Sequence, residues 1–207
     1  KPSLSASITT IVLAEGRFVE ELLDNNLHWV GSTNQRVINV PESLKTGEIS
    51  LKEQIYEYGK DIIFSSSFQS MKNYIQHGKI STFNHVIMVC YRALEYVNKH
   101  QIDCQRKELV RGALLHDYFL YDWHKKEKWH RLHGFKHAKI ALRTSKEDFQ
   151  ITPLEEDIIL HHMFPLNIKP PKHKEAWIVC YVDKVQSLKE INKNYQVEIN
   201  FDDYLLE

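Results

Sequence analysis

Apolar side chains recur every three or four residues along the last three quarters of the chain, which is the spacing of helices with one buried face. The pattern is clearest over residues 83–97, where Ser81 or Thr82 stands in the position of a helix cap. The same spacing predicts a helix over about 105–117 and a last long helix over about 173–190. The chain is therefore predicted to be built mainly from helices that pack through their apolar faces.

Local capping signals refine this pattern. Thr152 and Glu155 have the spacing of a capping box, with Pro153 at the first helical position, so a helix is predicted to begin near residue 153. Residues 51–78 predict a helix, a serine-rich break and a second helix that Gly78 closes. These features favour an all-α fold, a helical bundle with essentially no sheet.

The first 50 residues are harder to interpret. Residues 8–27 have nearly helical apolar spacing and predict one or two helices. Residues 31–50 are rich in turn formers around the short β-like sequence RVINV, and they predict a connection. We therefore expect an N-terminal extension of unclear role over residues 1–50 and one helical domain over residues 51–207.

Composition and charge restrict the classes of partner. The chain has 27 Lys and Arg residues and 27 Asp and Glu residues, so its net charge favours neither a nucleic acid polymer nor a membrane. Its apolar runs are far shorter than the roughly 20 residues that a bilayer span needs. The three cysteines form no CxxC pair and are interpreted as reduced thiols. With no secretory signal recognised, a cytoplasmic location is expected.

Asp183 is the most unusual residue of the last predicted helix. Seven apolar residues precede it and Val185 follows it, so this part of the helix is apolar nearly all round and is predicted to be buried. A buried carboxylate must be neutralised, paired or bound to a metal ion, because an isolated ionised carboxylate is very costly to bury. Pairing with a buried lysine or arginine is the alternative to a metal site.

Other ligand-type residues fall near apolar faces of separate predicted helices. They are His85, the adjacent pair His116 and Asp117, and Asp183. Divalent metal ions accept such a mixture of imidazole and carboxylate ligands. A single histidine is more often a surface or core residue, so the metal hypothesis depends on these residues occurring together.

The order of these residues resembles the HD-domain superfamily of metal-dependent phosphohydrolases. The resemblance covers roughly residues 68–190 and is carried by the sequences STFNHVIMVCYRAL, LVRGALLHDYFLYDW and YVDKVQSL. It implies an HD-domain helical bundle in which His85, His116, Asp117 and Asp183 hold a first metal ion.

The resemblance extends to the two-metal branch, which includes HD-GYP phosphodiesterases and bacterial diadenosine tetraphosphatases. It implies that His137, His161 and His162 are second-site candidates and that Asp117 bridges two ions. The alternative is that His161 and His162 merely end an amphipathic helix. The sequence departs from the branch in two places: HDYFLYD lacks the lysine that often follows the doublet, and HHMFPLNIKPPKHK replaces the GYP signature, which argues against cyclic di-GMP.

A basic segment follows the His-Asp pair. One interpretation is a solvated loop, and the other is a set of groups around a pocket for an anionic substrate. For the second interpretation, the substrate-binding candidates are Lys125, Lys128 and Arg131. Proton donors to the leaving group would be His133, Lys136 or Lys184.

The resemblance implies hydrolysis of a phosphate ester or anhydride of a small nucleotide-like substrate by a metal-activated hydroxide. Two divalent ions are expected, with Fe, Mn, Zn, Mg, Ni and Co all compatible with the ligands. Two other classes of function stay open. One is a di-iron oxygenase with the same fold, and the other is a non-catalytic nucleotide-binding sensor. Oligomeric state has no readable signal.

Overall fold

The computed structural model describes residues 27–29, 36–38, 50–125, 132–192 and 195. The chain divides into two compact units, Lys1–Ile49 and Ser50–Glu207. In the first unit, β1 (Leu27–Trp29) pairs antiparallel with β2 (Arg36–Ile38), and β2 confirms the β-like character of RVINV. The predicted helices over 8–27 lie outside the described residues, except that Leu27 begins a strand instead.

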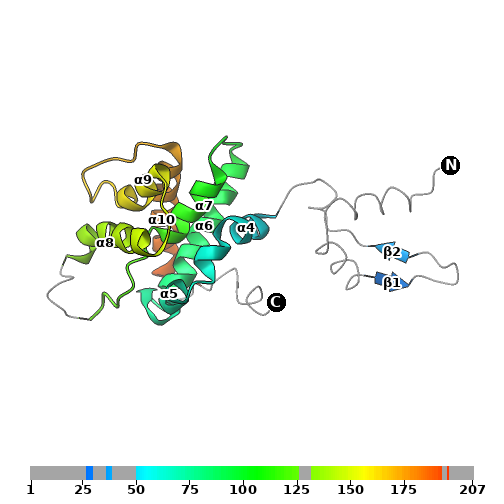
Figure 1. The fold of residues 1–207 in the computed structure, drawn as a ribbon, viewed down its shortest axis with the longest axis horizontal. Helices are drawn as coiled ribbons and strands as arrows, with labels where there is room; N and C mark the ends of the chain where they lie inside the picture. Colours follow the sequence, from blue (N-terminus) through cyan, green and yellow to red (C-terminus); the bar gives the residue numbers. More distant parts are fainter. Residues whose placement is uncertain (1–26, 30–35, 39–49, 126–131, 193–194, 196–207) are drawn as a thin grey trace. The chain divides into compact units, whose positions relative to one another are not determined.

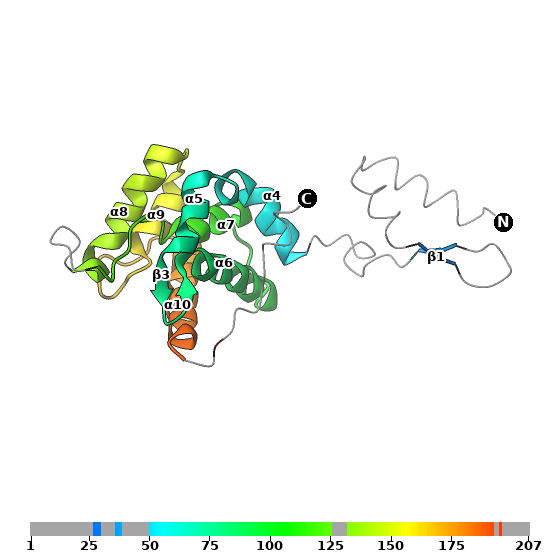
Figure 2. The ribbon, with the colours of Figure 1, turned by 90° about the horizontal axis from the view of Figure 1, so that it is seen from below.

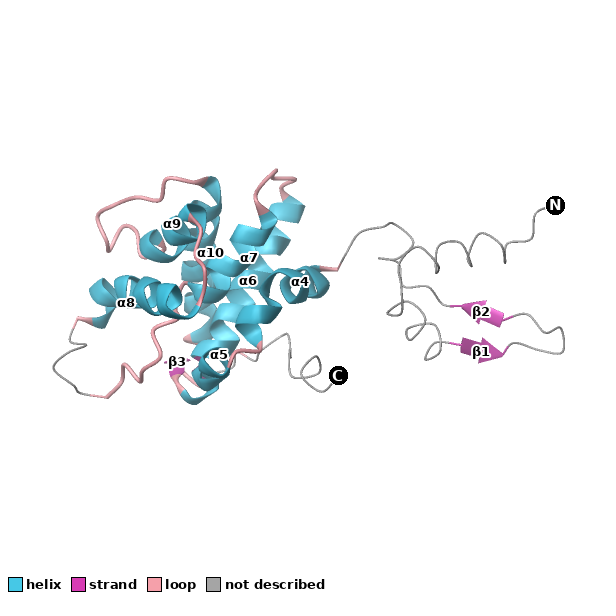
Figure 3. Cartoon of the chain, viewed as in Figure 1, coloured by secondary structure: helices cyan, strands magenta, loops and turns pink. Residues whose placement is uncertain are grey.

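The described part of the second unit is mostly helical, as predicted (Figure 1 and Figure 3). Its elements in chain order are α4 (Leu51–Ile63), α5 (Ser66–Ser70), the 3-10 helix η1 (Met71–Asn73), β3 (Ile75–His77), β4 (Ile80–Ser81), α6 (Thr82–Lys99), α7 (Arg106–Leu115), α8 (His133–Asp148), α9 (Pro153–His161) and α10 (Lys174–Glu190). No helix in the described part of the chain combines the length and apolarity needed to cross a membrane.

The predicted caps are confirmed. Ser81 Oγ accepts a hydrogen bond of 3.2 Å from the backbone N–H of Asn84 at the start of α6. Thr152 and Glu155 form the reciprocal capping box of α9, with Pro153 as its first residue. These bonds satisfy N–H groups that a helix leaves without partners at its first turn, so they fix where each helix begins.

The predicted second helix of residues 51–78 is wrong. After α5 and η1 the chain forms the β3–β4 hairpin, and Gly78 turns it with a φ of 57°. Along β3, Ile75 is exposed and Gln76 is buried, so the polar side chain points inward. The apolar pattern did not predict β3, because the buried position of this strand is occupied by the polar residue Gln76 and not by an apolar residue.

Helix α7 lies at the centre of the second unit and contacts α4, α6, α8, α9 and α10 (Figure 2). Its buried residues include Leu109, Val110 and Leu114, which pack with Val86 and Leu94 of α6 in one continuous core. Helix α10 packs against α6 and α9. This arrangement brings the C-terminal end of α7 close to α6, α8, α9 and α10.

Two glycines lie where helices pack closely: Gly112 of α7 faces α9, and Gly59 of α4 faces α7. A Cβ at Gly112 of α7 would lie 2.6 Å from Ile158 Cδ1 and 2.9 Å from Ile158 Cβ and Cγ2 in α9. A Cβ at Gly59 of α4 would collide only with the mobile Cδ1 end of Leu114. Close approach of α7 to α9 therefore depends on Gly112.

We predict that Gly112→Ala lowers the free energy of unfolding by about 1–3 kcal/mol, because a β-branched side chain cannot move aside and overpacking separates the helices. Gly59→Ala is the matched control. Its steric cost is offset by the gain of about 1 kcal/mol in helix propensity, so its net change is small. Urea denaturation of both variants measures the difference, and equal stabilities would contradict the packing argument.

Candidate metal centre

Six histidines and aspartates converge inside the second unit, three from within helices and three from the C-terminal ends of two other helices. All are buried, and they come from α6, the C-terminal end of α7, α8, the C-terminal end of α9, and α10: His85, His116, Asp117, His137, His162 and Asp183. They form two groups, each with ligand atoms within 4.8 Å of one another.

The first group contains His85, His116 and Asp183. Asp183 Oδ1 lies 3.2 Å from His85 Nε2 and 3.7 Å from His116 Nε2. Asp117 Oδ2 lies 3.7 Å and 3.5 Å from the same two nitrogens. Ligand atoms that stand about 2.1 Å from one ion are about 3.0–3.4 Å apart, so these four atoms have nearly the spacing of a coordination shell.

The second group contains Asp117, His137 and His162. Asp117 Oδ1 lies 3.2 Å from His137 Nε2 and 3.5 Å from His162 Nε2. The two imidazole nitrogens are 2.8 Å apart. Asp117 therefore turns one carboxylate oxygen toward each group.

All four imidazoles are oriented in the same way. The Nδ1 atoms of His116, His137 and His162 lie 2.7–3.0 Å from backbone carbonyl oxygens three or four residues earlier. Because a carbonyl oxygen only accepts, each Nδ1 carries the proton and each Nε2 offers a lone pair. His85 Nδ1 lies 2.8 Å from Glu190 Oε2, a carboxylate oxygen that likewise accepts from the Nδ1–H group. Such partners commonly fix the imidazoles of metal sites.

The donor set fits divalent metal ions. His116 Nε2 and Asp117 Oδ1 are buried and have no hydrogen-bond partner in the described part of the chain. Two Nε2 lone pairs facing each other across 2.8 Å also repel unless a proton or a cation lies between them. A cation in each group would satisfy these atoms at once. Mixed imidazole and carboxylate ligands suit several first-row metals equally.

Protonation in the metal-free chain follows from burial and charge. Burial opposes protonation of His85, but its hydrogen bonds to Asp183 and Glu190 raise its pKa to about 10. Burial lowers the pKa of His162 to about 3, so that imidazole is neutral. Burial also works against ionisation of Asp117, yet the surrounding imidazoles hold its pKa well below the usual value.

We predict that metal binding releases protons. His85 with a pKa of about 10 is protonated at pH 8, and a cation can take its Nε2 lone pair only after that proton leaves. Apparent metal affinity is therefore expected to rise with pH, about tenfold per unit for each proton released, until the pH passes the pKa of His85. Calorimetry in two buffers of different ionisation enthalpy measures the proton count. The exposed variant His124→Ala should keep this count, and a count of zero in the unaltered chain would contradict the prediction.

Two residues of the centre were missed by the sequence analysis. Gln76 Nε2 donates a 2.6 Å hydrogen bond to Asp117 Oδ2, and Thr82 Oγ1 donates to Gln76 Oε1 at 3.3 Å, which fixes the amide. Glu190, in the last turn of α10, is buried and orients His85. Glu190 comes seven positions after Asp183, which is two helical turns, so both side chains lie on the same face of the helix. This helical spacing was the one signal in the sequence that could have identified Glu190.

His161 lies outside both groups, and this geometry does not support its predicted role as a second-site ligand. Its Nδ1 lies 2.7 Å from Asp157 Oδ1. Asp157 Oδ2 also accepts hydrogen bonds from the backbone N–H groups of Lys172 and His173. Successive side chains of a helix point about 100° apart, so His161 faces the loop before α10 when His162 faces the centre.

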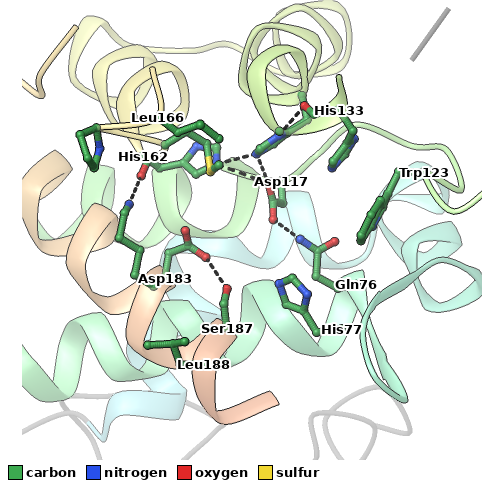
Figure 4. A pocket seen from close by; sticks show the side chains of 15 residues that line it. Gln76, His77, Asp117, Trp123, His133, His162, Leu166, Asp183, Ser187 and Leu188 are labelled. Atoms are coloured by element: carbon green, nitrogen blue, oxygen red, sulfur yellow. Dashed lines mark hydrogen bonds and ion pairs between the residues drawn. The ribbon is translucent and has the colours of Figure 1, made fainter. Parts of the chain in front are cut away.

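A cavity of about 970 Å³ opens beside the two groups (Figure 4). Asp117, His137, His162 and Asp183 contribute to its lining. His85 is fully buried behind them. A molecule in this cavity would therefore meet the second group directly and the first group through Asp117 and Asp183.

Two predicted proton donors also line the cavity. His133 stacks on His137 with ring centroids 4.6 Å apart, and its Nδ1 lies 2.9 Å from the hydroxyl of Tyr121. Lys184 Nζ donates to the carbonyl oxygens of His162 at 2.8 Å and Cys180 at 3.1 Å. His133 is thus directed at the cavity, whereas the Lys184 ammonium is bound to the backbone.

Of the predicted basic residues in this segment, the two lysines that the structure describes are not at the cavity. Lys125 and Lys136 are exposed and do not line it. Lys128 and Arg131 lie outside the described residues. Their predicted roles in binding an anionic substrate and the role of Lys136 as a proton donor stay predictions.

Comparison with known proteins agrees with this geometry. The family model described as HD domain matches residues 82–188, which is just over half of the chain. The match runs from three residues before His85 to five residues after Asp183, so it includes every histidine and aspartate of both groups. Searches of curated proteins and of solved structures give no match. On the family match and the converging ligands, this chain belongs to the HD-domain family.

Proposed function

We propose that this chain is a two-metal phosphohydrolase that cleaves a phosphate ester or anhydride of a small phosphorylated or nucleotide-like molecule. The observation that supports it best is Asp117, whose Oδ2 faces His85 and His116 while its Oδ1 faces His137 and His162. One carboxylate between two ligand groups is the arrangement of a bridged two-metal site. Family membership supports the reaction class.

Each group has a defined role in this proposal. His85, His116 and Asp183 would hold the first ion, His137 and His162 the second, and Asp117 both. Bound divalent ions lower the pKa of coordinated water and stabilise negative charge on phosphoryl oxygens. Gln76 holds the bridging carboxylate in place through its 2.6 Å hydrogen bond.

Hydrolysis needs one bond to form and one to break. The oxygen of water bonds to phosphorus, the phosphorus–oxygen bond to the leaving group breaks, and a proton passes to the leaving oxygen. His133 is the better placed of the two predicted donors that line the cavity, because the Lys184 ammonium already donates to two carbonyl oxygens. Lys184 and Lys136 stay as further candidates for that proton transfer.

A panel assay tests the proposal. The chain is stripped of metal, reloaded with Mn, Fe, Zn, Mg, Ni or Co, and incubated with phosphate monoesters, diesters and nucleotides. Phosphate release that depends on added metal is expected, with oxygen from labelled water in the phosphate product. Absence of hydrolysis with every metal would contradict the proposal, and ligand binding without turnover would instead favour a nucleotide sensor.

A di-iron oxygenase is the second candidate. The observation that favours it is the composition of both groups, because two imidazoles and one carboxylate form the ligand set of many non-haem iron oxygenases. Anaerobic purification, metal analysis and electron paramagnetic resonance distinguish the two. A mixed-valent iron signal together with substrate-dependent oxygen uptake would favour the oxygenase over the hydrolase.

A further inference from the structure

The cavity has two walls of different character beside the metal-ligand groups. Figure 4 shows Leu166 and Leu188 on one side, Trp123 and His133 on the other, and Asp117 between them. Met163 and Pro165 also line the cavity. Beyond the ligand groups, most of the lining is therefore carbon from aliphatic and aromatic side chains.

Cationic groups are scarce in this lining. Among the described residues that line the cavity, Lys184 is the lone lysine or arginine, and its ammonium already donates to two carbonyl oxygens. A phosphate chain that extends away from the ions would find no further lysine or arginine in this part of the structure. Among the described lining residues, the charge of the phosphoryl group would therefore be balanced mainly by ions held in the two metal-ligand groups.

The size and exposure of the walls also indicate an apolar occupant. A cavity of about 970 Å³ lies at the upper end of the range of about 300–1,000 Å³ for small-molecule sites, which is far more than one phosphoryl group needs. Leu188 is 72% exposed at the edge of this space. Covering it with an apolar group removes carbon surface from water and strengthens binding.

We infer that the substrate is a phosphomonoester whose esterifying group is apolar. Its phosphoryl group would lie at the metal-ligand groups, and its apolar group would lie between Trp123 and the leucine wall, which is formed by Leu166 and Leu188. This inference rests on the proposed hydrolase function. Water attacks phosphorus, the ester bond breaks, and the products are phosphate and an apolar alcohol that takes up a proton.

A homologous series of substrates tests the inference. The metal-loaded full chain is assayed with methyl, butyl, hexyl and phenyl phosphate, and with glycerol phosphate and ATP as polar comparators. Each added methylene is expected to raise kcat/KM by about three- to fourfold until the cavity is filled. A flat series, or glycerol phosphate or ATP as the best substrate, would overturn the inference.

A pair of matched variants tests whether the preference for longer esters comes from contact with Leu188. Leu188→Gln is expected to lower the ratio of kcat/KM for hexyl phosphate over methyl phosphate by about tenfold. Ile191→Gln is the control, because Ile191 is 62% exposed just after the same helix but does not line the cavity. It should leave the ratio unchanged. Equal ratios in both variants would show that the leucine wall does not contact the substrate.

A binding measurement distinguishes failure of the proposed hydrolase function from failure of the inference that the substrate has an apolar group. Alkylphosphonates of increasing length cannot be hydrolysed, and their affinity for the metal-loaded chain is measured by calorimetry. If no ester is hydrolysed but affinity still rises with chain length, the proposed hydrolase function fails and the apolar walls remain supported. If esters are hydrolysed but neither kcat/KM nor affinity depends on length, the hydrolase stands and the inference about its substrate fails.

Discussion

Replacing Asp117 with alanine is expected to lower both metal content and hydrolysis strongly. The change removes one ligand from each group, because the two carboxylate oxygens face different imidazole pairs. Metal content should fall below one ion per chain. Loss of metal-assisted charge stabilisation, worth several kcal/mol, corresponds to a fall in turnover of about a thousandfold. Metal analysis and phosphate release are measured on the same sample.

Asp103→Asn is the control for this experiment, because Asp103 is an exposed aspartate outside both groups. It should leave metal content and turnover unchanged. Circular dichroism checks that the Asp117 variant still folds. If Asp117→Ala retained two ions and full turnover, the bridged centre would be the wrong interpretation of this structure.

Replacing Arg111 with leucine is expected to lower the free energy of unfolding by about 3–5 kcal/mol. Arg111 is buried in α7 and joins α4 to α9, with its Nη1 2.7 Å from Asp61 Oδ1 and its Nε 2.9 Å from Glu155 Oε1. The Glu155 side chain is 1% exposed. Removing the guanidinium leaves that carboxylate buried beside no cation, which is more costly than the loss of the ion pair itself.

Urea denaturation measures this effect, with Arg143→Leu as the matched control. Arg143 pairs with Glu147 at 3.8 Å on the surface, where such pairs contribute about 0–1 kcal/mol. Adding Glu155→Gln to Arg111→Leu should restore part of the stability, because the amide is neutral. A loss no larger in Arg111→Leu than in Arg143→Leu would contradict the argument.

Helix periodicity and chemistry together predicted the helical fold and most of the centre. Asp183 stood out because a carboxylate in an apolar helix needs a cation, and the structure places it beside His85 and His116. The His-Asp pair was predicted at the end of a helix, where neighbouring side chains can face a common point. His116 is the C-cap residue of α7, directly after the last helical residue Leu115.

Other features depend on contacts that a single sequence does not reveal. Helix α8 was not predicted, because its buried face consists mainly of small residues such as Ala138 and Ala141, which give a weak apolar signal. Gln76 carries no signal in the sequence, and its contact with Asp117 depends on the β3–β4 hairpin. His161 and His162 are equivalent in sequence, and only the rotation of α9 decides which one faces the centre.

The six converging side chains span positions 85 to 183 and come from helices that occupy separate parts of the sequence. Any cation they hold acts as a cross-link, so folding and ion loading become one coupled equilibrium. A free ion at a hundred times its dissociation constant adds about 2.7 kcal/mol to the stability of the folded state. The concentration of the ion in the cell would then determine the folded fraction of the protein as well as its turnover rate.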